Sequence, residues 1–220
     1  MPIVSFLIFF PFLMAFILFF MKKASRLRSA TVIFGSIMVI AAVIYMAVIV
    51  LGRGGGEMTF LTETVVQDRV IMAGEIFLML LVFSQAIRFK KWYIILLSAA
   101  GTIPVIWLDL SGKAEGIAGS HIRIDNLTMI MCLVVGIVGG LICMYADGYI
   151  RDYHVHHKEF KDRSNYFLAM LFVFLGAMFG LITSNNLSWI YFFWEITSVC
   201  SFLLIGYSQA PEAVTNSFRA

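Results

Sequence analysis

The stretch that decides the fold lies near the end of the sequence, where residues 187–207 read LSWIYFFWEITSVCSFLLIGY. A helix needs ~20 mostly apolar residues to cross a bilayer core about 30 Å thick, and this segment has that length. Its acidic residue, Glu195, stands near the middle. The segment therefore predicts a membrane-spanning helix with a carboxyl group at membrane depth.

Segments of the same kind precede it along the chain, at residues 3–21, 30–51, 70–87, 92–109, 126–146 and 166–184. The 220 residues are 61% hydrophobic and 13% charged, with a mean hydropathy of +0.93. A chain this apolar cannot form the charged surface of a soluble globular domain. We predict an all-α fold, a polytopic transmembrane helical bundle of about seven spans.

The basic residues predict the orientation of the bundle. Twelve of the 16 Lys and Arg residues lie in alternate connections and near the final residues, at 22–28, 88–91, 151–163 and 219. The other four are Arg53, Arg69, Lys113 and Arg123. Because cytoplasmic connections carry the excess of positive charge, the amino terminus should face outside a cell membrane. The end of this chain should then be cytoplasmic.

Several motifs point away from other kinds of site. The net charge of +3 comes with no basic run interleaved with aromatics, so no nucleic-acid partner is expected. Cys132, Cys143 and Cys200 lie in apolar segments without cluster spacing, which argues against a disulfide framework or an iron–sulfur site. The glycines at 52–56 lack the Gly-Lys-Ser/Thr ending of a phosphate loop and indicate a turn.

The connection 151–163 contains three of the four histidines. Its spacing favours a solvated loop of mixed charge over a metal site, and a cytoplasmic docking surface is the functional alternative.

Two Gly-x-x-x-Gly pairs, Gly136 with Gly140 and Gly176 with Gly180, favour close packing between helices. Pro11 and Pro104 lie inside spans, where we expect local bends rather than helix ends.

Two acidic residues lie well inside the predicted spans, Glu195 and Glu75. A carboxyl group at membrane depth is costly and by default marks an ion path. Helical spacing places Ser188, Tyr191 and Ser198 on the same stripe as Glu195, as candidate members of a polar track. The alternative for Glu195 is a neutral, hydrogen-bonded structural acid. Glu75 stands closer to the outer end of its span, where contact with headgroups or water is an equal alternative.

Two further stretches carry a family resemblance. Residues 122–129, IRIDNLTM, precede a span, and residues 144–151, MYADGYIR, follow it. Together with residues 185–207 they resemble the antiporter-like family, which supplies the large membrane subunits of respiratory NADH dehydrogenase and its relatives. Asp125 is also explained as a helix cap and Asn185-Asn186 as a turn. Neither helix capping nor turn formation explains Glu195, the acid beside Trp194 in mid-membrane.

The resemblance implies a proton-pathway role for Glu195, paired with a lysine on a later helix that lies outside these residues. The extra helical pair at 70–109 and the final residues 211–220 look more like the large membrane subunit of energy-converting hydrogenases. We expect residues 1–120 to form the N-terminal membrane helices and residues 121–220 to begin the proton-translocating domain. Residues 212–219 predict the start of another helix, so a fragment of a longer protein is expected.

The implied function is a proton-translocating subunit of an energy-converting redox complex, with Na⁺/H⁺ exchange left open. The resemblance implies no cofactor in this chain, with iron–sulfur centres, and nickel–iron centres in a hydrogenase, held by partner subunits. Its partners would be other membrane subunits, a cytoplasmic redox arm and lipid. A separate multisubunit cation/proton antiporter and a non-transporting membrane scaffold are the alternatives.

Overall fold

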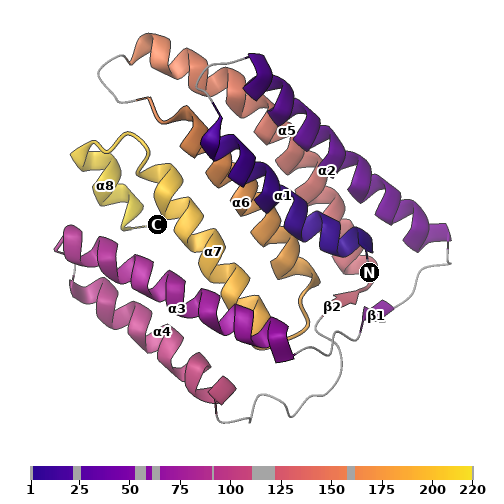
Figure 1. Cartoon of the computed structure of the whole chain (residues 1–220), viewed down its shortest axis with the longest axis horizontal. Coiled ribbons are helices and arrows are strands. Elements are labelled where there is room, and N and C mark those ends of the chain that lie inside the picture. Colours follow the sequence, from indigo (N-terminus) through magenta and orange to yellow (C-terminus); the bar gives the residue numbers. More distant parts are fainter. Residues whose placement is uncertain are drawn as a thin grey trace.

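The computed structural model describes residues 2–21, 26–52, 58–60, 65–90, 92–110, 122–157 and 162–219. Their helices are α1 (Pro2–Phe20), α2 (Arg26–Gly52), α3 (Val65–Arg88), α4 (Trp92–Leu110), α5 (Asn126–His156), α6 (Ser164–Thr183), α7 (Leu187–Ile205) and α8 (Pro211–Ser217). The long helices alternate in direction, so one end of the bundle gathers the ends of α1, α3, α5 and α7 (Figure 1). The two strands are β1 (Met58–Phe60) and β2 (Ile122–Ile124).

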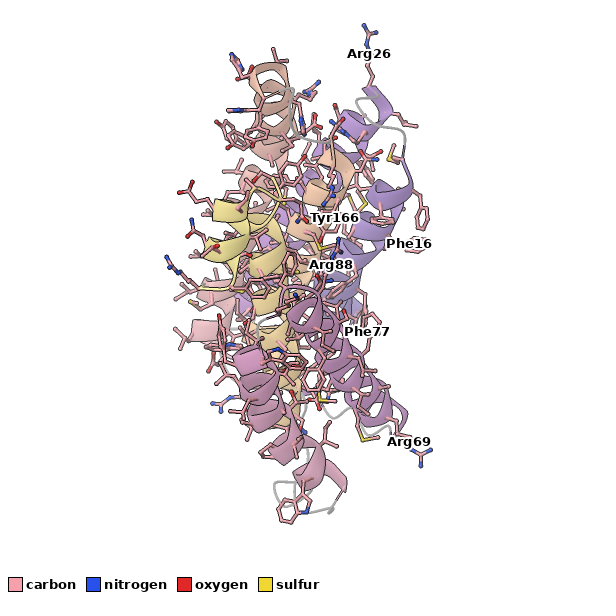
Figure 2. The ribbon with its side chains drawn as sticks, turned by 90° about the vertical axis from the view of Figure 1, so that its left-hand side faces the viewer. Phe16, Arg26, Arg69, Phe77, Arg88 and Tyr166 are labelled. Atoms are coloured by element: carbon pink, nitrogen blue, oxygen red, sulfur yellow. The ribbon has the colours of Figure 1, made fainter. Side chains whose placement is uncertain are left out.

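The chain is a multi-pass membrane protein. Within the described residues, six helices are long and apolar enough to cross a bilayer, and the shorter apolar stretch Trp92–Trp107 lies in α4. Large apolar side chains such as Phe16 and Phe77 point outward from the bundle (Figure 2). An apolar exterior is what lipid requires, so the predicted all-α membrane bundle is confirmed.

The core of the bundle forms around α6, which packs against α1, α5 and α7, while α2 packs against α5. Small residues allow these close approaches. A Cβ atom at Gly136 would lie 2.5 Å from the Val43 side chain of α2, and one at Gly176 would lie 2.9 Å from the Ile8 carbonyl oxygen of α1. Both Gly-x-x-x-Gly pairs therefore serve helix packing, as predicted.

The predicted extra helical pair is α3 and α4, and it lies beside the core. Helix α7 stands between α3 and α6 in Figure 1, and α3 packs against both α7 and α4. Strand β1 precedes α3 and strand β2 follows α4. The two strands pair antiparallel, with Phe60 opposite Ile122. The sequence analysis did not predict this sheet, because strands of three residues show no periodicity.

Helix α5 is longer than the span predicted from hydrophobicity, and residues 151–156 are its last turns rather than part of a loop. Side chains four residues apart explain the extension. Arg151 pairs with Asp147 at 3.1 Å, and Asp152 lies 3.8 Å from His156. Such pairs support a helix beyond the apolar segment. The rest of that connection lies partly outside the described residues, as do Lys113 and most of the glycine turn at 52–56.

Other local predictions are confirmed. Pro11 and Pro104 lie inside continuous helices, α1 and α4, and do not end the spans, while the local bends expected there stay a prediction. The short helix α8 occupies the region where another helix was expected to begin. The side chain of Asp125 caps α5 by accepting a hydrogen bond from the Thr128 backbone N–H at 2.7 Å, and this bond lowers the pKa of the carboxyl group.

A buried polar network fastens one end of the core. Arg28 was assigned to a connection by its charge, yet it lies in α2 and is wholly buried. Its guanidinium donates to Asp147 Oδ1 at 2.9 Å, Ser164 Oγ at 2.7 Å and Asn165 Oδ1 at 3.1 Å. The Ser29 hydroxyl donates to the other oxygen of Asp147 at 2.7 Å. These bonds tie α2 to α5 and α6 without leaving the arginine charge uncompensated.

Candidate proton-transfer site

Helix α7 carries Glu195 into the middle of the bundle. The helix begins after Asn186, whose side-chain oxygen accepts the Ser188 backbone N–H at 2.9 Å. That cap, predicted from sequence as a turn, fixes the start of α7 directly after α6. Glu195 follows about two helical turns later, far from either helix end.

The carboxyl group of Glu195 meets a hydroxyl from the extra helical pair. Thr102 of α4 is wholly buried, and its Oγ1 donates to Glu195 Oε1 at 3.1 Å. The Tyr191 hydroxyl lies 3.3 Å from the same Thr102 oxygen. A continuous set of polar atoms therefore runs from Tyr191 through Thr102 to Glu195.

The second oxygen of Glu195 is in a different position. Oε2 is buried and makes no hydrogen bond to the described residues. A buried acceptor without a partner is unfavourable in a folded protein. Glu195 is thus held on one side and keeps one oxygen available for a proton or another donor.

Glu75 belongs to the same neighbourhood. It lies on α3 with a side chain that is wholly buried, so it contacts neither headgroups nor bulk water here. Its carboxyl group and that of Glu195 both interact electrostatically with the Tyr191 hydroxyl. The structure thus brings the two intramembrane acids of the sequence toward one tyrosine.

Glycines beside these residues let the helices approach. A Cβ atom at Gly101, next to Thr102, would lie 2.8 Å from the Tyr191 hydroxyl oxygen. One at Gly74, next to Glu75, would lie 2.5 Å from the Phe192 ring. Both distances are shorter than real Cβ contacts allow, so glycine at each position brings α3 and α4 close to α7.

The remaining members of the predicted polar track lie elsewhere on α7. The exposed Ser198 hydroxyl donates to the Trp194 carbonyl oxygen at 3.1 Å within its own helix. Ser188 lies in the first turn, at the capped end. The sequence analysis did not name Thr102 as a site residue, because it lies on another helix and carries no charge.

The histidine connection forms a second polar group. His154 Nε2 lies 2.7 Å from the Tyr207 hydroxyl and 3.5 Å from Asp162. Across the described ranges, no three His, Cys, Asp or Glu side chains are placed to hold a metal ion. The three cysteines, all described, are free and buried in the core.

Comparison with known proteins finds a family match in the middle of the chain. Residues 118–160 match the family described as NADH-ubiquinone oxidoreductase (complex I), chain 5 N-terminus. This stretch contains β2 and α5, the segment whose sequence carried the resemblance.

The resemblance to the antiporter-like chain 5 family is confirmed.

Similar proteins extend the match. The chain is 36% identical over 133 residues to NADH-quinone oxidoreductase subunit L of Rhodobacter capsulatus. The matched residues make up 59% of this chain and 18% of that protein. It is 44% identical over 84 residues to the chloroplastic NAD(P)H-quinone oxidoreductase subunit 5 of Poa pratensis, 38% of this chain and 11% of that protein. The chain therefore matches less than a fifth of the length of either antiporter-like relative.

Proposed function

We propose that this chain is part of a proton-translocating membrane subunit of a complex I-type oxidoreductase. Electron transfer takes place in partner subunits, and Glu195 binds and releases a proton within the membrane. The observation that carries the proposal is a carboxyl group in mid-helix that is held by Thr102 through one oxygen while the other stays available. The similarity to complex I membrane subunits supports the same assignment.

The available oxygen indicates how the site would be completed. The resemblance implies a lysine on a later helix, and Oε2 is the atom to which such a cation would donate. Approach of the cation favours the carboxylate, and its withdrawal favours the protonated acid, because burial disfavours an isolated charge. Alternation between the two states moves one proton per cycle.

A membrane-bound hydrogenase is the narrower form of this proposal. The extra pair α3–α4 supports it, because it lengthens the region before the matched segment. The partner subunits would then hold nickel–iron as well as iron–sulfur centres. Hydrogen oxidation coupled to ion movement in the purified complex, with NADH oxidation absent, is the result expected of a hydrogenase.

The test of the general proposal is Glu195→Gln in the complete complex. Glutamine keeps the shape and the hydrogen bond from Thr102 but cannot carry a proton. We expect assembly to be retained and redox-driven acidification in sealed vesicles to fall by ~100-fold, a modest value for a positioned proton-transfer group. Glu195→Asp should retain part of the activity, because it still titrates but reaches less far.

Glu212→Gln is the matched control. Glu212 is exposed on α8, so the same chemical change there should leave acidification unchanged. Normal proton-to-electron stoichiometry in Glu195→Gln would reject Glu195 as the carrier and favour the scaffold alternative. A multisubunit cation/proton antiporter would instead show Na⁺-gradient-driven proton flux without any redox substrate.

A further inference from the structure

We propose that the α3–α4 pair supplies a second proton-binding group, Glu75, which exchanges protons with Glu195 through Tyr191 and Thr102. This inference rests on the proposed function of Glu195 and deepens it. It gives the α3–α4 pair a role in proton transfer between α3 and α7, in addition to its role in helix packing.

The first support is the burial of Glu75. Its side chain has no exposed surface, although α3 lies at the periphery of the bundle and offers much of its surface to lipid. A carboxyl group in such a place could have reached an aqueous end of the helix; instead it is enclosed, on a helix that packs against α4 and α7. Intramembrane acids in this setting mark proton or ion paths by default.

The second support is the direction of the hydrogen bonds. Thr102 has a single hydroxyl proton, and it is donated to Glu195 Oε1 at 3.1 Å. Either hydroxyl can donate in the 3.3 Å contact between Thr102 and Tyr191. While Glu195 is a carboxylate and takes the Thr102 proton, the tyrosine is the donor. The Tyr191 and Thr102 hydroxyl groups then lead toward Glu195. On the other side, α3 packs against α7 and brings Gly74, the neighbour of Glu75, against the ring of Phe192, the neighbour of Tyr191.

This arrangement allows a balanced proton transfer. Protonated Glu75 gives its proton to the Tyr191 oxygen, directly or across one water molecule, as Tyr191 passes its own proton to Thr102. Thr102 passes its proton to Glu195 Oε1. Both hydroxyl groups end neutral, Glu75 ends as a carboxylate and Glu195 as a carboxylic acid. One negative charge is moved from α7 to α3.

The third support is the pair of glycines that precede Glu75 and Thr102. Gly74 precedes Glu75 and faces Phe192, and Gly101 precedes Thr102 and faces Tyr191. A Cβ atom at Gly74 would displace the Phe192 ring, and one at Gly101 would displace the Tyr191 hydroxyl that contacts Thr102. Proton transfer requires heavy atoms within about 3 Å, or one water between them, so the close approach serves the transfer directly.

The test uses single substitutions in the complete complex, in sealed vesicles driven by its own electron donor. Glu75→Gln, Tyr191→Phe and Thr102→Val each remove one proton-carrying group with little change of volume. Each should slow acidification by ~100-fold. Thr102→Ser restores the hydroxyl and should recover most of the rate. Tyr145→Phe, at an exposed position on α5, and Glu212→Gln are the matched controls and should behave as the unsubstituted complex.

A spectroscopic measurement separates a proton carrier from a structural acid. In redox-induced infrared difference spectra, the D₂O-sensitive carbonyl stretch of protonated carboxyl groups should lose one component in Glu75→Gln. A structural acid keeps its proton throughout turnover and contributes no such component. Spectra of Glu75→Gln identical to those of the unsubstituted complex would overturn the inference.

The two proposals fail in distinguishable ways. Normal pumping by Glu75→Gln together with impaired pumping by Glu195→Gln rejects the second carrier and leaves the first in place. Normal pumping by both variants rejects the proposed function itself. If Glu75→Gln does not assemble, Tyr191→Phe and Thr102→Val test the second carrier. Normal pumping by both variants would show that Tyr191 and Thr102 do not connect the two acids.

Discussion

Arg28 and Asp147 form the most completely buried ion pair among the described residues, with side chains 0% and 4% exposed. Two charges in such a place are tolerated only because each has several partners. Arg28 reaches Asp147, Ser164 and Asn165, and Asp147 also accepts from Ser29. Removing one charge leaves the other buried and uncompensated, which costs more than the pair contributes.

Asp147→Asn should therefore destabilise the protein by about 3 kcal/mol, because asparagine keeps the shape but leaves the Arg28 charge without a counter-ion. Thermal unfolding in detergent, followed by tryptophan fluorescence, measures the change. Asp152→Asn is the matched control on the same helix, since its side chain is 78% exposed and should change stability little. Equal effects at the two positions would show that burial does not govern the loss.

These two residues also mark the limit of what sequence could predict about individual side chains. Glu195 stood out because an acid in an apolar segment is conspicuous wherever it packs. Arg28 did not, since its place beside a basic connection looked like that of any cytoplasmic arginine. Thr102 lies 93 positions before Glu195, and only the packed helices bring it into reach.

The helices themselves were largely predictable, because a bilayer imposes a length and an apolar composition on each one. Their capped ends were predictable too, at Asp125 and Asn186, where a short polar side chain precedes an apolar run. The last turns of α5 were not, because they are held by pairs four residues apart rather than by lipid. Strands β1 and β2 depend on pairing between distant segments, which no local pattern records.

Asn186→Ala should lower stability by ~1 kcal/mol, the usual effect of losing a helix N-cap. The lost bond is the one that Asn186 Oδ1 accepts from the Ser188 backbone N–H. Asn186→Ser keeps a capping oxygen and should recover most of the loss. Chemical denaturation of the two variants in the same detergent gives the comparison, and equal stability of Ala and Ser would indicate that the cap contributes nothing.

The whole molecule has two chemically different ends. Arg26 and Arg69 project from opposite ends of the bundle in Figure 2. The described basic residues of the alternate connections lie at or after the ends of α1, α3, α5 and α7 along the chain. The positive-inside bias predicts that the end of the bundle with Arg26 is cytoplasmic.

Cysteine labelling in sealed, right-side-out vesicles tests that orientation. A membrane-impermeant thiol reagent should modify Arg123→Cys and spare His156→Cys until the vesicles are opened. The native cysteines are buried and should give little background. Preferential labelling of His156→Cys from outside would reverse the predicted orientation.

The small sheet at the outer predicted end bears on how such a chain can change over evolutionary time. Phe60 and Ile122 face each other in register, so a two-residue turn would close the chain between them without α3 and α4. An inserted or deleted pair of helices crosses the membrane an even number of times. Every later helix then keeps its sidedness, and a gene could acquire or lose Glu75 and Thr102 together in a single event at this junction.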